Sequence, residues 1–179
     1  MIERRAFLLS LTAALLARSR SAHAGGPERR LHILKAKRTL EYEEDGVVVR
    51  SFRVGLGGAP EGDKQRQGDS KTPEGELYVG WKLEQSRFHR FLGLSYPMPI
   101  HAERGQKAKL IDAKTAEVIR QAVAHKRPPP QNTRLGGDVG IHGGGSSVDW
   151  TLGCIAVTDE EIEWLFARVR VGDPVLIEP

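Results

Sequence analysis

The chain of 179 residues has a single cysteine, Cys154. It therefore cannot form a disulfide within itself, and its thiol is at risk of oxidation in an oxidising compartment. A lone cysteine is either a small buried apolar side chain or a reactive nucleophile. Without context the buried role would be favoured, but His142 and the glycines near Cys154 favour the reactive one.

Several ligand signatures are also missing. The glycines of residues 55–75 do not follow the G-x-G-x-x-G spacing of a dinucleotide-binding turn, and no G-x-S-x-G nucleophile elbow occurs. The histidines other than His142 show no metal-binding spacing, so surface or structural roles are expected for them. They are His23, His32, His89, His101 and His125. We therefore predict neither a metal nor a cofactor.

Long apolar segments are absent as well. The most apolar stretch, residues 6–17, is too short for a comfortable membrane span. It follows Arg4 and Arg5 and precedes the small-x-small site Ala22-His23-Ala24, so residues 1–24 are predicted to be an export signal, with an uncleaved anchor as the alternative. The export route is either the general secretory or the twin-arginine one. We expect a protein of the periplasm or cell envelope that meets the membrane only through this segment during export.

The excess of positive charge is small. The full chain has a formal net charge of +4. Removal of residues 1–24 takes away four arginines and one glutamate, which leaves a net charge of +1. So small an excess gives little support for binding to nucleic acid, and no such partner is predicted.

The remaining sequence predicts one domain. Residues 25–30 are expected to form a mobile mature N-terminus and residues 31–179 the catalytic domain, which is long enough to enclose a core. Helices are predicted at residues 114–125, where apolar residues share one face, and from Thr158 to about residue 168, where Thr158 and Glu161 form a capping box.

Short apolar or alternating runs predict the strands, and Asp45-Gly46 predicts a hairpin turn. The runs span residues 31–36, 39–42, 47–49, 52–54, 77–81, 88–94 and 175–177. The predicted fold is mostly β with two helices (α+β), a β-sandwich or mixed sheet with the site at a sheet end.

The stretch of residues 139–157 carries the chemistry. His142 and Cys154 each lie at the end of a short apolar run, and a Gly- and Ser-rich loop joins the runs. An imidazole can take the proton of a thiol, which is a strong nucleophile only as thiolate. Glycine lets main-chain N–H groups approach a developing oxyanion. The pattern therefore indicates covalent acyl transfer through a thioester.

Three segments resemble the L,D-transpeptidase (YkuD-type) family of bacterial cell-wall enzymes. The third is the strongest, because order, spacing and flanking strands all agree. The segments are Gly68-Asp69 with Thr72-Pro73-Glu74-Gly75, Leu94-Ser95-Tyr96-Pro97, and Ile141-His142-Gly143 with Asp149-Trp150-Thr151-x-Gly153-Cys154-Ile155-Ala156-Val157-Thr158.

The resemblance implies a role for each residue of the site. Cys154 would be the nucleophile and His142 its base, and a carbonyl near Gly143 would orient the imidazole. Main-chain amides around Thr151, Gly153 and Cys154 would form the oxyanion hole. The further residues with an implied or candidate place in the substrate pocket are Tyr96, Asp149 and Trp150, although the last two could instead anchor the loop.

The resemblance also implies the substrate. A peptidoglycan stem peptide would form a thioester at the L-centre of its third residue, usually diaminopimelate, and release a terminal D-amino acid. An amine from another stem or from a tethered lipoprotein would then resolve the thioester.

Two departures from the family pattern leave open whether the reaction is transfer or hydrolysis. Leu152 replaces the histidine of the common Ser/Thr-His-Gly-Cys motif, and Ala156 replaces the common arginine two residues after the cysteine. If water resolves the thioester, the enzyme is an L,D-carboxypeptidase or amidase instead of a transferase. A third alternative is a non-catalytic wall-binding module whose cysteine is buried.

Overall fold

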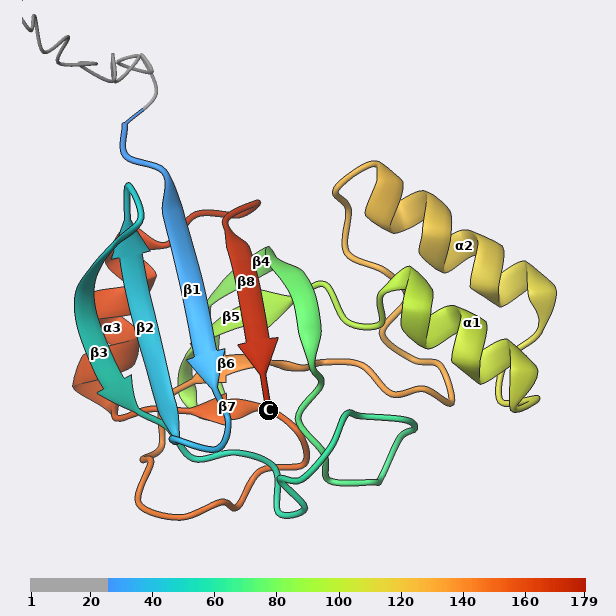
Figure 1. Ribbon diagram of the computed structural model, residues 1–179, viewed down its shortest axis with the longest axis horizontal. Helices are drawn as coiled ribbons and strands as arrows, with labels where there is room; N and C mark the ends of the chain where they lie inside the picture. Colours follow the sequence, from blue (N-terminus) through green and yellow to red (C-terminus); the bar gives the residue numbers. More distant parts are fainter. Residues whose placement is uncertain (1–25) are drawn as a thin grey trace, which may run out of the picture.

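The computed structural model describes residues 26–179, so the predicted export signal lies outside the described residues. Eight strands and three helices form this part of the chain (Figure 1). The strands are β1 (Arg29–Leu34), β2 (Thr39–Glu44), β3 (Val47–Arg53), β4 (Gly75–Ser86), β5 (His89–Leu94), β6 (Gly140–His142), β7 (Ile155–Ala156) and β8 (Pro174–Glu178). The helices are α1 (Pro99–Lys107), α2 (Ala113–Ala124) and α3 (Asp159–Arg168).

The strands form one mixed sheet in the order β3-β2-β1-β8-β4-β5-β6-β7. The pairs β1–β8 and β6–β7 are parallel, and the other neighbours are antiparallel. The sheet curls until its two ends meet, because Gly55, just beyond β3, exchanges two main-chain hydrogen bonds of 2.9 and 2.8 Å with Ala156 of β7. The closed sheet encloses the main apolar core.

Local sequence explains the first hairpin. Asp45 and Gly46 both have positive φ angles, of 50° and 75°, as the two central residues of a type I′ turn require. On β2, Leu40 and Tyr42 are fully buried while their neighbours are partly exposed, which is the alternation of a strand with one face on the core. The predicted turn and strands are thus confirmed, and residues 47–49 and 52–54 join into the single strand β3.

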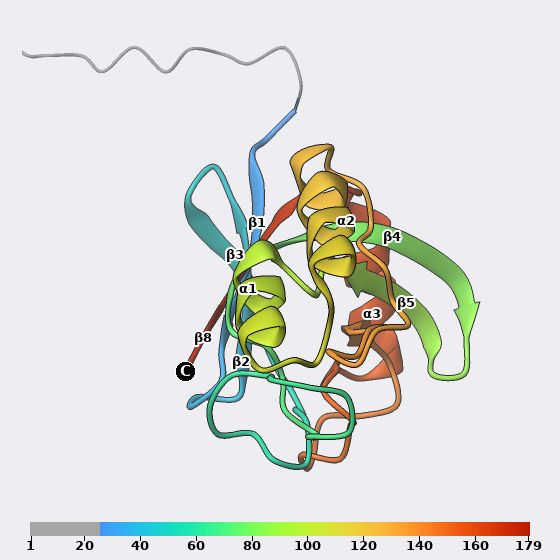
Figure 2. The same cartoon turned by 90° about the vertical axis from the view of Figure 1, so that its right-hand side faces the viewer.

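The helix α3 packs against both arms of the curled sheet. Its Trp164 lies edge-on to Tyr42 of β2, with ring centroids 5.1 Å apart, and α3 also contacts β5 and β6. Figure 2 shows α3 on the β4–β5 side of the molecule, and Figure 1 shows α1 and α2 at the opposite end from it. The predicted capping box is present, since Thr158 accepts from the Glu161 amide and Glu161 accepts from the Thr158 amide.

The prediction of two helices was wrong, because the structure has a third, α1. Its polar sequence PIHAERGQK carries no apolar stripe, and the residues that it buries are His101, Ala102 and Gly105. With α2 it forms a hairpin (Figure 1). This hairpin has a small apolar cluster of its own. At the other end of the domain, β1 begins at Arg29, within the segment expected to be mobile. None of the helices in the described part of the chain is long and apolar enough to span a membrane.

We predict that Thr158→Ala lowers the free energy of unfolding by about 1 kcal/mol, because the first turn of α3 loses its side-chain cap. Thermal or urea unfolding followed by circular dichroism measures the change. Glu160→Gln, at an exposed position in the same turn, should cost only about 0.3 kcal/mol. Equal effects of the two substitutions would contradict the cap.

Candidate active site

His142 lies on β6, and Cys154 stands directly before the neighbouring parallel strand β7. Ile141 pairs with Ile155 and His142 with Ala156, and Cys154 directly precedes β7. Because side chains alternate along a strand, Cys154 points to the same face as Ala156 and therefore as His142. By this alternation the side chains of Cys154 and His142 lie on one face of the sheet, offset by two residues along the strands.

The imidazole of His142 is held in one orientation. It is 2% exposed, and its Nδ1 lies 2.7 Å from the carbonyl oxygen of Gly143. A carbonyl oxygen only accepts, so Nδ1 carries the hydrogen and Nε2 presents a lone pair. Phe88 stacks on the ring at a centroid distance of 4.7 Å, and Trp150 lies edge-on to it at 5.6 Å.

Burial keeps this imidazole neutral. It lowers the pKa of His142 below its ordinary value, and the hydrogen bond to the Gly143 carbonyl only partly opposes this effect. At neutral pH the ring is therefore unprotonated at Nε2 and can accept a proton, which is the state that a general base needs.

The thiol of Cys154 is also neutral. The residue is partly exposed, and its Sγ donates to the carbonyl oxygen of Asp138 at 3.3 Å. Burial raises the pKa of the Cys154 thiol to about 11, although the amide of Gly140 and the charge of Lys64 act to lower it. Within the described residues no hydrogen bond joins Sγ to the imidazole. At neutral pH both groups are therefore neutral, with a thiol on Cys154 and an unprotonated imidazole on His142.

Two of the predicted oxyanion amides are already engaged. The N–H of Thr151 donates to the Leu56 carbonyl at 3.1 Å, and the N–H of Gly153 donates to the Thr151 hydroxyl at 3.1 Å. The same hydroxyl donates to the carbonyl of Cys154 at 2.8 Å. These bonds brace the turn before the cysteine. The main-chain N–H of Cys154 donates to no group among residues 26–179, which leaves it open beside Sγ.

The long loop of residues 55–75 packs directly on this turn. Gly153 has a φ angle of +134°, and a Cβ there would lie 2.6 Å from the carbonyl oxygen of Lys71. On the loop itself, a Cβ at Gly57 would lie 2.1 Å from the carbonyl oxygen of Ser70. Only glycine permits these approaches. The loop therefore forms part of the wall of the site.

The loop between β6 and β7 is anchored at both ends. Asp149 accepts hydrogen bonds from the amide of Leu56 at 2.9 Å and from Nη2 of Arg38 at 2.7 Å. The side chain of Asp159, the first residue of α3, accepts from the amide of Gly144 at 2.8 Å. The contacts of Asp149 are thus those of a loop anchor, which was one of its two predicted roles.

The other two pocket candidates differ in their placement. Trp150 is 37% exposed and forms a wall of the site, with its Nε1 donating to the Gly145 carbonyl at 3.0 Å. Tyr96 is fully buried, and its hydroxyl donates to the Leu135 carbonyl at 2.9 Å. Tyr96 therefore lies in the packed interior and presents no surface to a substrate.

Sequence reasoning missed three residues that surround the reactive pair. Phe88 stacks on the imidazole, the Asp138 carbonyl holds the thiol, and the charge of Lys64 acts on it. Each lies in a loop, and none belongs to a motif. Their polar or turn-rich surroundings gave no signal, apart from the glycines at 136 and 137 that precede Asp138.

One group of side chains has the spacing of metal ligands. Ligand atoms of His32, Glu41 and Glu43 lie within 4.8 Å of one another on β1 and β2. Among the described residues, none of the three forms a hydrogen bond or an ion pair with Cys154 or His142, and His32 instead pairs with Glu41, Glu43 and Glu178.

The model of the YkuD family, the L,D-transpeptidase catalytic domain, matches residues 28–177. No curated protein sequence matches the chain.

Solved structures share the fold at low identity. The helical cell shape determining protein Pgp2 from Campylobacter jejuni is 22% identical with a TM-score of 0.55, and the match covers 86% of this chain and 48% of that one. Bd1075 from Bdellovibrio bacteriovorus is 19% identical with a TM-score of 0.55, and the match covers 88% of this chain and 50% of that one. An L,D-transpeptidase from Xylanimonas cellulosilytica is 18% identical with a TM-score of 0.50, and the match covers 87% of this chain and 63% of that one. The chain thus spans between 48% and 63% of the length of these relatives.

These matches confirm the predicted fold class, and at such identities they speak for the fold alone. The family model extends over most of the chain and includes β6, β7 and the loop between them. On this match, the chain belongs to the family of L,D-transpeptidase (YkuD) catalytic domains.

Proposed function

We propose that the protein is an exported cysteine acyltransferase that acts on peptidoglycan stem peptides through a thioester on Cys154. One observation carries the proposal above all. Cys154 and His142 share a face of two neighbouring strands, and the Gly143 carbonyl fixes the imidazole with Nε2 free to take a proton. Membership of the family supplies the substrate class.

The first half-reaction begins when a stem-peptide carbonyl reaches Sγ. The thiol proton passes from Sγ to Nε2 of His142, the sulfur–carbon bond forms, and the oxyanion receives a hydrogen bond from the Cys154 amide. The carbon–nitrogen bond then breaks, and the leaving D-amino acid takes the proton from Nε2. A thioester and a neutral imidazole remain.

The second half-reaction runs the same steps in reverse order. An amine of another stem, or of a lipoprotein acceptor, attacks the thioester and gives its proton to Nε2. The new carbon–nitrogen bond forms, the carbon–sulfur bond breaks, and the proton returns to Sγ. If water takes the place of the amine, the product is a free acid, and the protein is an L,D-carboxypeptidase or amidase.

The cellular role follows from the same proposal. The segment of residues 1–24 would export the protein to the periplasm or cell envelope, where stem peptides are found. The relative from Campylobacter jejuni is described as a helical cell shape determining protein. We extend a role in wall remodelling and cell shape to this chain on that basis.

We predict that Cys154→Ala abolishes both products when the protein is incubated with tetrapeptide stems. His142→Ala should lower the rate at least about 100-fold, because general-base catalysis typically contributes that much. His125→Ala, at the exposed end of α2, is the matched control and should leave the rate unchanged. Mass spectrometry of the products separates cross-linked dimers, which indicate transfer, from free acids, which indicate hydrolysis. Turnover by Cys154→Ala would refute the mechanism.

We also predict an unusual pH dependence of thiol labelling. Because burial raises the pKa of Cys154 to about 11, iodoacetamide should react about tenfold faster per pH unit from pH 7 to 10. A free cysteine would level off above its pKa of about 8.5. Stopped-flow or mass-spectrometric rates in the absence of substrate give the profile. A plateau near pH 8 would show that the resting site holds an activated thiolate.

Complete resistance to iodoacetamide in the folded protein, over the whole pH range, would favour the wall-binding module. The partial exposure of Cys154 argues against that alternative.

A further inference from the structure

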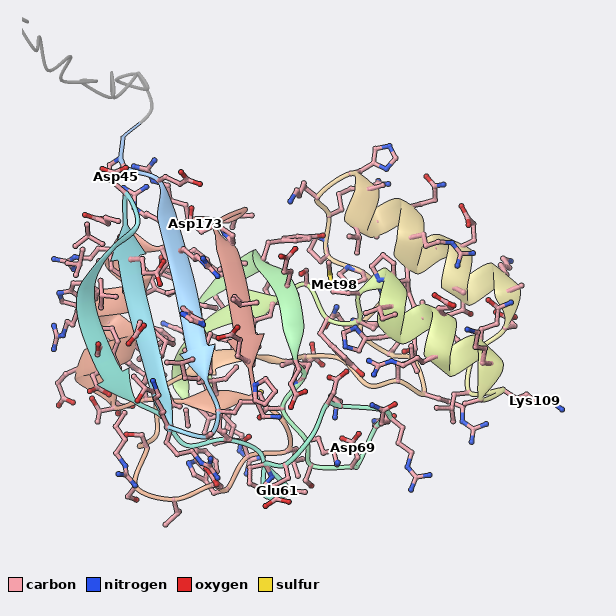
Figure 3. The ribbon with its side chains drawn as sticks, in the orientation of Figure 1. Asp45, Glu61, Asp69, Met98, Lys109 and Asp173 are labelled. Atoms are coloured by element: carbon pink, nitrogen blue, oxygen red, sulfur yellow. The ribbon has the colours of Figure 1, made fainter. Side chains whose placement is uncertain are left out.

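A cavity of about 440 Å³ lies between the long loop and the first helix of the hairpin. From the loop it is lined by Lys64, Arg66, Asp69 and Lys71, and from α1 by residues that include His101. Figure 3 shows the loop around Asp69 lying below α1, beside the curled sheet. Nothing in the mechanism above uses this cavity.

Two buried nitrogens in the wall formed by α1 lack a hydrogen-bond partner. They are Nε2 of His101 and Nε of Arg104. Nδ1 of His101 accepts from the Met98 amide at 3.1 Å, so in the neutral ring Nε2 carries the hydrogen. The closest carboxylate oxygen, on Asp63, is 3.5 Å from Nε2 and already accepts from the Glu74 amide. A donor that is 97% buried and unpaired is costly, and a ligand oxygen would satisfy it.

The charges around the cavity favour an anion. Lys64 is paired with Asp69 at 2.7 Å, and Arg104 is paired with Asp63, so these four charges balance. Among the described residues no carboxylate pairs with Arg66 or with Lys71, whose Nζ donates to a main-chain carbonyl instead. The cavity is therefore lined by two uncompensated positive charges.

Lys64 connects the cavity to the reactive cysteine. Its buried side chain runs between two glycines: a Cβ at Gly136 would lie 3.2 Å from Cε of Lys64, and a Cβ at Gly153 would lie 3.5 Å from its Nζ. Gly153 is the residue before the nucleophile. The charge of Lys64 also lowers the pKa of the Cys154 thiol. Lys64 therefore lines the cavity and also lies against the residue that precedes Cys154.

We propose that this cavity binds a carboxylate of the donor stem peptide, with Lys64, Arg66, Lys71 and Nε2 of His101 as its partners. The inference rests on the proposed function and names a subsite for it. Cys154 is followed by Ile155, Ala156 and Val157, so the segment that carries the cysteine offers no cation of its own. The carboxylate comes either from the departing D-amino acid or from the side chain of the third residue. Both have the same chemistry, and amidation of one or the other distinguishes them.

Binding is measured by isothermal titration calorimetry with the full chain carrying Cys154→Ala, so that no ligand is turned over. The ligands are a tetrapeptide stem with diaminopimelate, the same peptide amidated at its C-terminus, and the same peptide amidated at the diaminopimelate side chain. We expect one of the amides to bind about tenfold more weakly than the parent peptide, since a charge-assisted hydrogen bond is lost.

Variants assign that loss to the cavity. Lys64→Gln should weaken binding of the parent peptide about tenfold and remove the difference between it and the sensitive amide. Arg66 is exposed, so Arg66→Gln should not disturb folding. It should reduce the difference in binding between the parent peptide and the sensitive amide about threefold. Lys107→Gln, an exposed lysine of α1 that pairs with Glu103, is the matched control and should change nothing.

The outcomes separate the two proposals. Equal binding of all three peptides, or an unchanged difference in both Lys64→Gln and Arg66→Gln, overturns the carboxylate subsite and leaves the proposed function standing. If no stem peptide binds to the folded protein at millimolar concentration, both proposals fall.

Discussion

The closure of the sheet by Gly55 and Ala156 is the constraint on which the site depends. The strand β7 has only two residues and could not be held by its pairing with β6 alone. The two main-chain hydrogen bonds to Gly55 fix its other edge. Only glycine fits at position 55, because a Cβ there would lie 2.4 Å from the carbonyl oxygen of Val148 in the loop between β6 and β7. The position of Cys154 is thus set by backbone contacts from a segment a hundred residues earlier in the sequence.

The neutral state of the Cys154 thiol affects how easily the single cysteine of the chain is oxidised. Thiolates are oxidised and alkylated much faster than thiols, so a thiol whose pKa is raised to about 11 is protected in an oxidising compartment. In the proposed mechanism the substrate would activate the thiol, because it would displace the Asp138 carbonyl as the partner of Sγ and let the proton reach His142. The burial that makes Cys154 a weak acid also makes His142 available as a base.

Much of the fold could be predicted because local chemistry agrees with it. The Asp45-Gly46 turn, the capping box of α3 and the alternation in β2 each follow from neighbouring residues. The helix α1 could not be predicted, because its buried face consists of a histidine, an alanine and a glycine instead of large apolar residues. The second half of β4 was also missed, because it is exposed and polar and is held by pairing with β5 instead of by burial.

The residues of the site also divide into those that the sequence predicts and those that it does not. His142 and Cys154 could be found because their motif is continuous in sequence with the strands that carry it. Lys64 could not, because a lysine in a polar loop looks like a solvated side chain until the fold buries it to 3% exposure against Asp69. A buried ion pair stabilises little after desolvation is counted, so stability alone does not explain why this one is placed behind Gly153. Its place beside Cys154 is better explained by the proposed carboxylate subsite, since the strands β6 and β7 themselves carry no lysine or arginine.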